Sequence, residues 1–175
     1  MRVEIATRRW VVKAFLLFLI ASTIGCDQVS RHVATTHLMG ARHQSFLGDM
    51  LRLQYAENTG AFLSWGTSLP PWARTALFTV GTAVILFLCA VATLQRDWAG
   101  LPQVGLALVL GGGISNLADR IHYGAVVDFL NIGIGSLRTG VFNVADMAIM
   151  LGVALLLLFG MRRTDSGEGA EEEIP

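Results

Sequence analysis

The residues of this chain best placed to do chemistry are acids that lie in or beside apolar stretches. Asp27, Asp119 and Asp146 fall within or at the ends of long apolar runs, and Asp128 stands alone in an apolar loop segment. Ionisable groups in such surroundings are costly to bury, so each is a candidate functional residue. Two carboxylates held together share one proton, the arrangement by which an aspartyl peptidase activates water. A proton or ion relay would also gather acids in a membrane, and spacing alone leaves both readings open.

Each acid has polar neighbours at helical spacing. Asp27 and Arg31 are four residues apart, and Asn143 and Asp146 are three apart, so each pair can share a helix face. A further single face carries Gly112, Asn116 and Asp119. Three consecutive glycines at 111–113 remove side chains, which lets another helix or an extended peptide approach closely.

Structural roles compete with chemical ones at these positions. Asp27 with Arg31 is explained equally well as a helix-end salt bridge. Asp119 followed by Arg120 favours an interfacial ion pair that fixes its helix over a catalytic role. Asp146 has no basic residue within one helical turn in the sequence, so it is the hardest acid to explain structurally.

The composition indicates what kind of protein must position these acids. Hydrophobic residues make up 53% of the 175 residues and charged residues only 15%. A soluble domain usually carries about 25% charged residues. The composition therefore predicts one membrane domain and argues against a soluble globule, a disordered chain or a secreted disulfide scaffold. The formal net charge of zero indicates no nucleic-acid partner.

Four apolar stretches are long enough to cross a bilayer as helices, at about 10–28, 72–94, 101–119 and 141–161. Basic residues precede the first stretch, follow the fourth and include Arg96 between the second and third. The positive-inside rule places these sites, and so both termini, in the cytoplasm, although the longer connections also carry arginines. The sequence thus predicts an all-α polytopic membrane protein with one domain at 1–163. The Gly- and Glu-rich tail at 164–175 is expected to be disordered.

The helical rise places three of the acids at one depth. Asp27, Asp119 and Asp146 each lie 15 or 16 residues from the expected cytoplasmic end of their helices. At ~1.5 Å per residue, this is about 22–24 Å, close to the outer membrane interface. Three helices are therefore expected to deliver carboxylates to the same level.

Alternation predicts a short strand in the first outer connection. Leu51, Leu53 and Tyr55 alternate with polar residues, which is typical of a half-buried strand. Asn58-Thr59-Gly60 is expected to form the turn that ends it.

The cysteines and histidines predict no further chemistry. Cys26 and Cys89 are expected on opposite sides of the bilayer, which argues against a disulfide. The four histidines lack metal-binding spacing, so no metal and no cofactor are expected.

Five motifs follow one another on this frame of four helices. They are Asp27-Gln28-Val29-Ser30-Arg31, Asn58-Thr59-Gly60-Ala61-Phe62, Gly111-Gly112-Gly113-Ile114-Ser115-Asn116-Leu117-Ala118-Asp119-Arg120, Val126-Val127-Asp128-Phe129 and Phe142-Asn143-Val144-Ala145-Asp146. Together they resemble the motifs of lipoprotein signal peptidase, or signal peptidase II, a family of bacterial inner-membrane aspartyl peptidases. The resemblance covers roughly residues 10–162.

The resemblance implies roles for particular residues. It implies that Asp128 and Asp146 are the catalytic pair. Supporting or substrate-binding roles are implied for Asp27, Arg31, Asn58, Gly112, Asn116, Asp119, Arg120 and Asn143.

The resemblance also implies an extracytoplasmic β cradle and an interfacial flap helix within about 44–71. Residues 44–58 fit the cradle. Residues 61–72 fit the flap, with Phe62, Leu63, Trp65 and Trp72. Two positions depart from the family pattern. Arg31 stands where a lysine is usual, and Ser115 stands where a glycine is frequent. The charge at 31 is kept, but Arg and Lys differ in hydrogen-bonding geometry.

The resemblance further implies the substrate, the location and the partners. The substrate would be a prolipoprotein with diacylglycerol on its lipobox cysteine, cut just before that cysteine. The enzyme would lie in the inner membrane, with its active site near the outer (periplasmic) leaflet. A monomer is expected because the site needs only one chain. Globomycin-type cyclic peptides would inhibit it.

Two other functions compete with this one. Thr23-Ile24-Gly25-Cys26 after a basic start resembles the lipobox of a lipoprotein, but Thr23 replaces the usual leucine and three further membrane helices would be odd. A small proton-coupled transporter could use the acids as a relay. The sequence lacks the paired halves with broken helices that mark many transporters.

Overall fold

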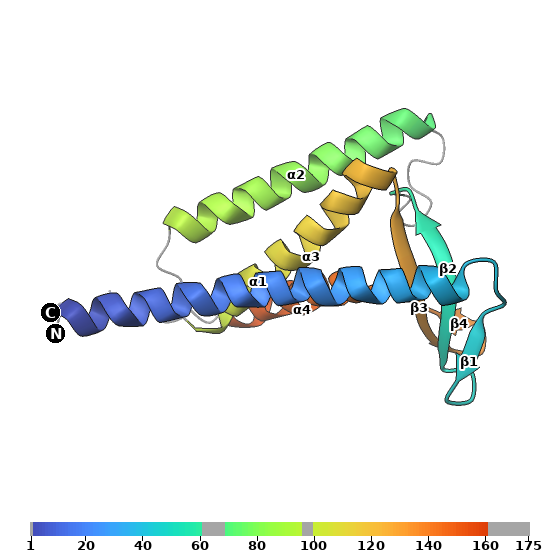
Figure 1. Ribbon diagram of the computed structural model, residues 1–175, viewed down its shortest axis with the longest axis horizontal. Coiled ribbons are helices and arrows are strands. Elements are labelled where there is room, and N and C mark those ends of the chain that lie inside the picture. Colours follow the sequence, from blue (N-terminus) through green and yellow to red (C-terminus); the bar gives the residue numbers. More distant parts are fainter. Residues whose placement is uncertain (1, 61–68, 96–99, 161–175) are drawn as a thin grey trace, which may run out of the picture.

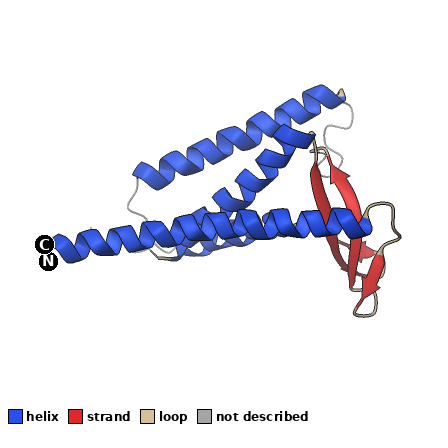
Figure 2. Ribbon diagram, in the orientation of Figure 1, coloured by secondary structure: helices blue, strands red, loops and turns tan. Residues whose placement is uncertain are grey.

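The computed structural model describes residues 2–60, 69–95 and 100–160. The helices are α1 (Arg2–Leu38), α2 (Pro71–Gln95), α3 (Leu101–Tyr123) and α4 (Val144–Gly160). The strands are β1 (Gln44–Phe46), β2 (Leu51–Asn58), β3 (Val126–Ile134) and β4 (Leu137–Arg138). The helices form an elongated bundle, and the strands form a sheet across one end of it (Figures 1 and 2). The prediction of apolar helices with a small β unit is confirmed.

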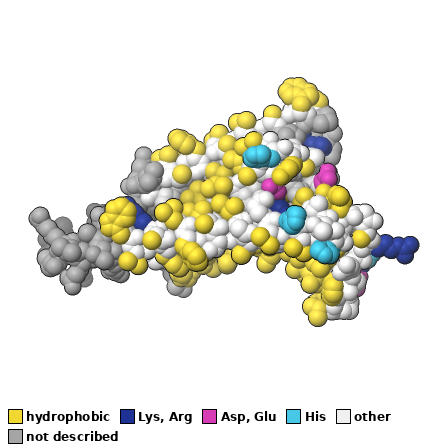
Figure 3. Space-filling view, viewed as in Figure 1, with side chains coloured by type: hydrophobic (Ala, Val, Ile, Leu, Met, Phe, Trp, Pro, Cys, Tyr) yellow, Lys and Arg dark blue, Asp and Glu magenta, His cyan; other side chains and the backbone are white. Residues whose placement is uncertain are grey.

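Three helices of the described ranges are long and apolar enough to cross a membrane. Their apolar segments are Trp10–Leu38, Trp72–Val91 and Leu101–Tyr123. The apolar part of the fourth, Val144–Phe159, is shorter. Large apolar side chains stay exposed along these helices, among them Phe18, Phe87 and Leu158. Figure 3 shows a mostly apolar face along the bundle. Such a surface is suited to contact with lipid tails rather than with water.

Helix α3 is the centre of the bundle and contacts each of the other helices. The three glycines at 111–113 point at three different neighbours. A side chain at Gly111 would strike Thr23 of α1, one at Gly112 would strike Ala145 of α4, and one at Gly113 would strike Leu86 of α2. The predicted close approach of other helices at these glycines is confirmed.

Helix α1 continues to Leu38, so the predicted end near residue 28 is wrong. The apolar residues Ala34 and Leu38 of the added turns are buried and form a small core with Phe129 of β3. Packing against the sheet thus accounts for the helical turns after residue 28. Gly40, with φ of 75°, follows the helix end in the left-handed conformation that glycine favours.

The sheet is antiparallel throughout, in the order β1-β2-β3-β4. The predicted strand at 51–55 is confirmed and extends to Asn58. The predicted turn after it also forms, since the Gly60 amide donates to Asn58 Oδ1 at 2.9 Å. The loop expected around Asp128 is instead strand β3. Val126 and Asp128 are buried and Val127 is less so, which is the alternation of a strand. This alternation was not recognised in the sequence because the buried position 128 carries a charged residue.

The predicted flap helix falls on residues that are mostly outside the described ranges, including Phe62, Leu63 and Trp65. Trp72, also assigned to the flap, lies in the first turn of α2 and is exposed. The predicted tail at 164–175 is likewise outside the described residues.

Candidate active site

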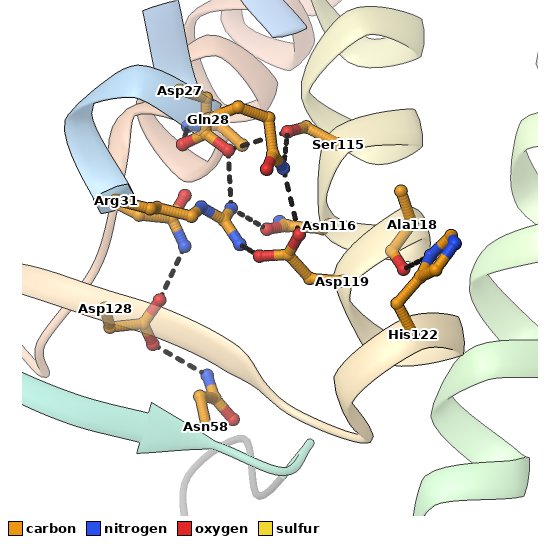
Figure 4. Close-up of polar contacts among 12 residues, drawn as sticks. Asp27, Gln28, Arg31, Asn58, Ser115, Asn116, Ala118, Asp119, His122 and Asp128 are labelled. Carbon is orange, nitrogen blue, oxygen red and sulfur yellow. Dashed lines mark hydrogen bonds and ion pairs between the residues drawn. The ribbon is translucent and has the colours of Figure 1, made fainter. Parts of the chain in front are cut away.

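A buried charge network joins α1 to α3 at the sheet end of the bundle (Figure 4). Arg31 Nη2 lies 2.7 Å from Asp27 Oδ2 and 2.5 Å from Asn116 Oδ1, while Nη1 pairs with Asp119. All four side chains are buried. One guanidinium therefore satisfies three acceptors from two helices, which its rigid planar fork allows.

Two interpretations of these acids made from the sequence are corrected by the structure. The ion-pair partner of Asp119 is Arg31, not the adjacent Arg120 as predicted. The pair of Asp27 and Arg31 forms as expected, but inside α1 rather than at its end.

Asp27 also ties α1 to the start of α4. Its Oδ1 accepts the backbone N–H of Ala145 at 2.8 Å, and its Oδ2 accepts the Ser115 hydroxyl at 2.7 Å. The side chain of Asp27 is fully buried. A carboxylate at a helix N-terminus satisfies a free amide and complements the helix dipole. Asp27 thus fixes the residue directly before Asp146.

Asp146 is held by a reciprocal cap at the start of α4. Its backbone N–H donates to Asn143 Oδ1 at 2.9 Å, and its Oδ2 accepts the Asn143 N–H at 3.2 Å. This is the pattern of a capping box. The remaining oxygen, Oδ1, accepts from Asn116 Nδ2 at 2.9 Å. The position of this carboxylate is therefore set by two helices.

Asp128 meets the same asparagine from the sheet. Asn143 Nδ2 donates to Asp128 Oδ1 at 2.5 Å, and Asn58 Nδ2 of β2 donates to Asp128 Oδ2 at 3.0 Å. Asn143 therefore contacts both Asp128 and Asp146 at the junction of the sheet and the bundle. Figure 4 shows the contact of Asp128 with Asn58.

The pKa of Asp128 lies closer to neutral pH than that of an ordinary carboxyl group. Burial raises the pKa of Asp128 from 3.8 to about 6, and the nearby Asp146 charge adds to this rise, while the hydrogen bonds from Asn58 and Asn143 oppose it. Arg120 supplies a positive charge that interacts with both acids, with Asp146 more than with Asp128. Its Nε is buried and has no hydrogen-bond partner among the described residues.

Residues 19–162 match the family described as signal peptidase II. The chain belongs to the signal peptidase II family. Members are aspartic peptidases, so the chain is a hydrolase.

Relatives and solved structures extend the match. A lipoprotein signal peptidase of Burkholderia cenocepacia is 40% identical over 141 residues, covering 78% of this chain and 81% of the relative. One of Burkholderia multivorans is 39% identical over the same coverage. A solved structure described as a bacterial membrane enzyme has a TM-score of 0.73 at 23% identity, covering 93% of this chain and 95% of that one. This last likeness shows the shared fold.

The ten site residues predicted from the sequence of this signal peptidase lie in one region, around two connected groups. Asp27, Arg31, Asn116 and Asp119 form the charge network, and Asn58, Asp128, Asn143 and Asp146 form the second group. Asn116 connects the groups, since it contacts both Arg31 and Asp146. Gly112 lies against Ala145, and Arg120 interacts with the acids through its charge.

Sequence reasoning on this peptidase missed two polar residues of the network. Ser115 is fully buried, donates to Asp27 and accepts from Gln28 Nε2 at 3.0 Å. Gln28 also donates to Asp119 Oδ1 at 2.9 Å. Ser115 lies four residues before Asp119, so helical spacing offered a signal for it.

Proposed function

We propose that this peptidase cleaves prolipoproteins whose lipobox cysteine carries a diacylglyceryl group, cutting just before that cysteine. The family match and the relatives named lipoprotein signal peptidase support this substrate. The observation that carries the catalytic part is the contact of one asparagine, Asn143, with both Asp128 and Asp146.

In the proposed mechanism the two acids divide the proton chemistry. Asp146, whose two oxygens both accept N–H donors, takes a proton from water as the water attacks the peptide carbonyl. Asp128, with its raised pKa, donates a hydrogen bond to the carbonyl oxygen as negative charge develops there. The amine then leaves with the proton that Asp146 had taken. Neither a metal nor a covalent intermediate enters these steps.

The remaining site residues hold or complement this pair. Asp27, Arg31, Asn116 and Asp119 position α4 relative to α1 and α3, and so position Asp146. Asn58 and Asn143 orient Asp128. Arg120 compensates charge near both acids, and Gly112 allows α4 to approach α3.

We place the enzyme as a monomer in the bacterial inner membrane, crossing it four times, with both termini in the cytoplasm. The start of α1 and the end of α4 lie at the same end of the bundle, opposite the sheet, which supports this orientation (Figure 1). The acids then lie near the outer leaflet, where the diacylglyceryl group anchors the substrate. Lipid chains contribute about 0.8 kcal/mol per buried CH₂, enough to make them a major recognition element. Globomycin-type cyclic peptides are expected to inhibit this site.

A cleavage assay in detergent tests the proposal. The purified protein is offered a prolipoprotein with and without its diacylglyceryl group, and the product is followed by gel shift. We expect cleavage of the lipidated form alone. Asp128→Asn and Asp146→Asn should each lower the rate by at least about 10³-fold, because loss of a residue of a catalytic unit has effects of that order.

Asp49→Asn is the matched control, because this carboxylate lies in the β1–β2 turn and pairs with Arg52. Its variant should retain most activity. Wild-type activity in a folded Asp128→Asn or Asp146→Asn variant would remove that acid from the catalytic pair.

A further inference from the structure

A cavity of about 400 Å³ lies beside the catalytic acids but is not lined by them. It is enclosed by the outer part of α1, the last turn of α3 and the strands β2 and β3. Val127 lines it, whereas the next residue, Asp128, points to the opposite face of the strand and meets Asn58 and Asn143. Strand β3 therefore separates this cavity from the acid pair. Its volume is within the range of small-ligand sites.

Most hydrogen-bond donors of the lining are already in use. Arg31 gives both terminal nitrogens to Asp27, Asn116 and Asp119, and its Nε is buried and has no hydrogen-bond partner among the described residues. Gln28 donates its amide hydrogens to Ser115 and Asp119.

Tyr55 donates its hydroxyl to Glu57 Oε1 at 2.8 Å. Burial first, and the neighbouring Glu57 next, raise the pKa of Tyr55, so this hydroxyl keeps its proton. Arg31, Gln28 and Tyr55 therefore have few donors left for a ligand.

The lining offers a ligand free hydrogen-bond acceptors and negative charge. The carbonyl oxygen of Gln28 accepts no hydrogen bond from the described residues, and Glu57 is exposed at the rim with only Tyr55 bonded to it. Arg31 is shared by two carboxylates, Asp27 and Asp119, so with Glu57 the surroundings of the cavity carry a net negative charge. The exposed ring of Tyr123 adds a face that favours cations. These features select a ligand with a positive charge and N–H donors.

The surroundings connect this cavity to the membrane. Val29 and Val33 of α1 and Ile121 of α3 are large apolar residues near its lining, and all three are at least half exposed (64%, 50% and 64%). All lie within the apolar segments that are able to cross a bilayer. Figure 3 shows separate acidic and histidine patches on the visible face toward the sheet end, with apolar surface around them. Acyl chains can pack on the apolar flanks while a polar headgroup enters the cavity.

We propose that this cavity binds the headgroup of an aminophospholipid, with its primary ammonium at Glu57, Gln28 and Tyr123. His32 and Thr35, which also line the cavity, supply donors for the adjacent phosphate. The phosphate is common to many phospholipids, so selectivity comes from the ammonium and its acceptor Glu57.

Native mass spectrometry of the full protein in detergent tests this site. The protein is titrated with short-chain phosphatidylethanolamine and, separately, with the matching phosphatidylglycerol. We expect tighter binding of the ethanolamine lipid. Glu57→Gln should weaken it by about tenfold or more, because the variant keeps an acceptor oxygen but removes the negative charge that pairs with the ammonium. Binding of the glycerol lipid should change little.

The control removes a different carboxylate from the same sheet. Asp49→Asn should leave the preference for the ethanolamine lipid intact, since Asp49 does not line the cavity. Unchanged thermal unfolding of Glu57→Gln shows that any lost binding is local. Equal affinity for the two lipids, or no effect of Glu57→Gln, would overturn the proposal. Phosphoethanolamine without acyl chains binding as tightly as the lipid would refute the membrane source and leave a soluble amine as the ligand.

Discussion

At the scale of single residues, the site depends on asparagines as much as on acids. Asn143 contacts both proposed catalytic carboxylates, and Asn116 links the charge network to Asp146. Neutral amides can donate and accept at once, so they can hold two carboxylates close without adding charge. The acids alone would repel each other.

The raised pKa of Asp128 predicts a pH dependence of stability. Between pH about 4 and about 6 the folded protein keeps this proton, whereas the unfolded chain has released it. The free energy of unfolding therefore falls as pH rises through this window, in total by about 3 kcal/mol at ~1.4 kcal/mol per unit. Thermal unfolding of the wild type and of Asp128→Asn in detergent, from pH 4 to 7, measures it.

Only the difference between the two proteins reports on Asp128, because other groups also titrate. The wild type should lose stability relative to Asp128→Asn as pH rises to about 6 and then level off. Parallel curves across the range would show that Asp128 titrates normally.

The contacts of Asp119 predict that this residue stabilises the fold. It is buried, pairs with Arg31 and accepts from Gln28. Asp119→Asn removes one of the two carboxylates that pair with Arg31, while Asp27 remains paired with it. The loss of a buried hydrogen bond to a charged group costs about 1.5–3 kcal/mol. We expect a clearly lower midpoint of thermal unfolding and lower expression. Wild-type stability of the purified variant would contradict a structural role for Asp119.

At the scale of elements, close helix contacts decide where the acids lie. Gly112 brings α4 against α3 beside Asn116, and Gly105 and Gly152 face each other further along the same pair. Side chains at these positions would meet backbone atoms, which cannot move aside as a flexible side chain can. The distance between α3 and α4 at the site is therefore set by glycines, which have no side chain.

Gly152→Ala tests this contact away from the acids. The new methyl group would strike the Gly105 carbonyl and lie 2.8 Å from Val109 Cγ2. Overpacking of this kind costs about 1–3 kcal/mol, so thermal unfolding should shift to lower temperature. Gly81→Ala in α2 is the matched control, because nothing lies within 4 Å of the added group. It should be neutral or stabilising, since alanine favours helix. Equal effects of the two variants would exclude a specific α3–α4 contact.

At the scale of the whole molecule, an antiparallel sheet closes one end of an apolar bundle (Figure 2). The acids lie where the two meet, with Asp128 from the sheet and Asp146 from the bundle. In the proposed function, the lipid-anchored substrate reaches this boundary from the membrane and water reaches it from outside.

The proposed orientation can be measured in intact cells. In a variant with Cys26 and Cys89 replaced by alanine, Ser136→Cys places a thiol in the exposed turn between β3 and β4. A membrane-impermeant maleimide should label it without cell lysis. Tags at either terminus should resist protease added to spheroplasts until lysis. Labelling only after lysis, or cleavage of a tag in intact spheroplasts, would reverse or break the proposed topology.

The sequence by itself determined the class of the protein and the identity of its polar residues. Charges are so rare in the apolar runs that Asp27, Asp119 and Asp146 stood out, and helical rise alone placed them at one level. The Asn143–Asp146 cap was also readable from spacing, although its role as a cap was not recognised.

Only the tertiary structure decided which of these groups meet. Asp119 forms its ion pair with Arg31 and not with the adjacent Arg120. The carboxylate of Asp27 accepts the backbone N–H of Ala145, and Asp128 lies on a strand instead of a loop. These contacts join residues from distant parts of the chain, and local propensity carries no information about them. Helix α1 is longer than the sequence predicted for the same reason, because the sheet buries Ala34 and Leu38. Long-range burial and charge pairing, which depend on how the helices and the sheet pack, fixed the site.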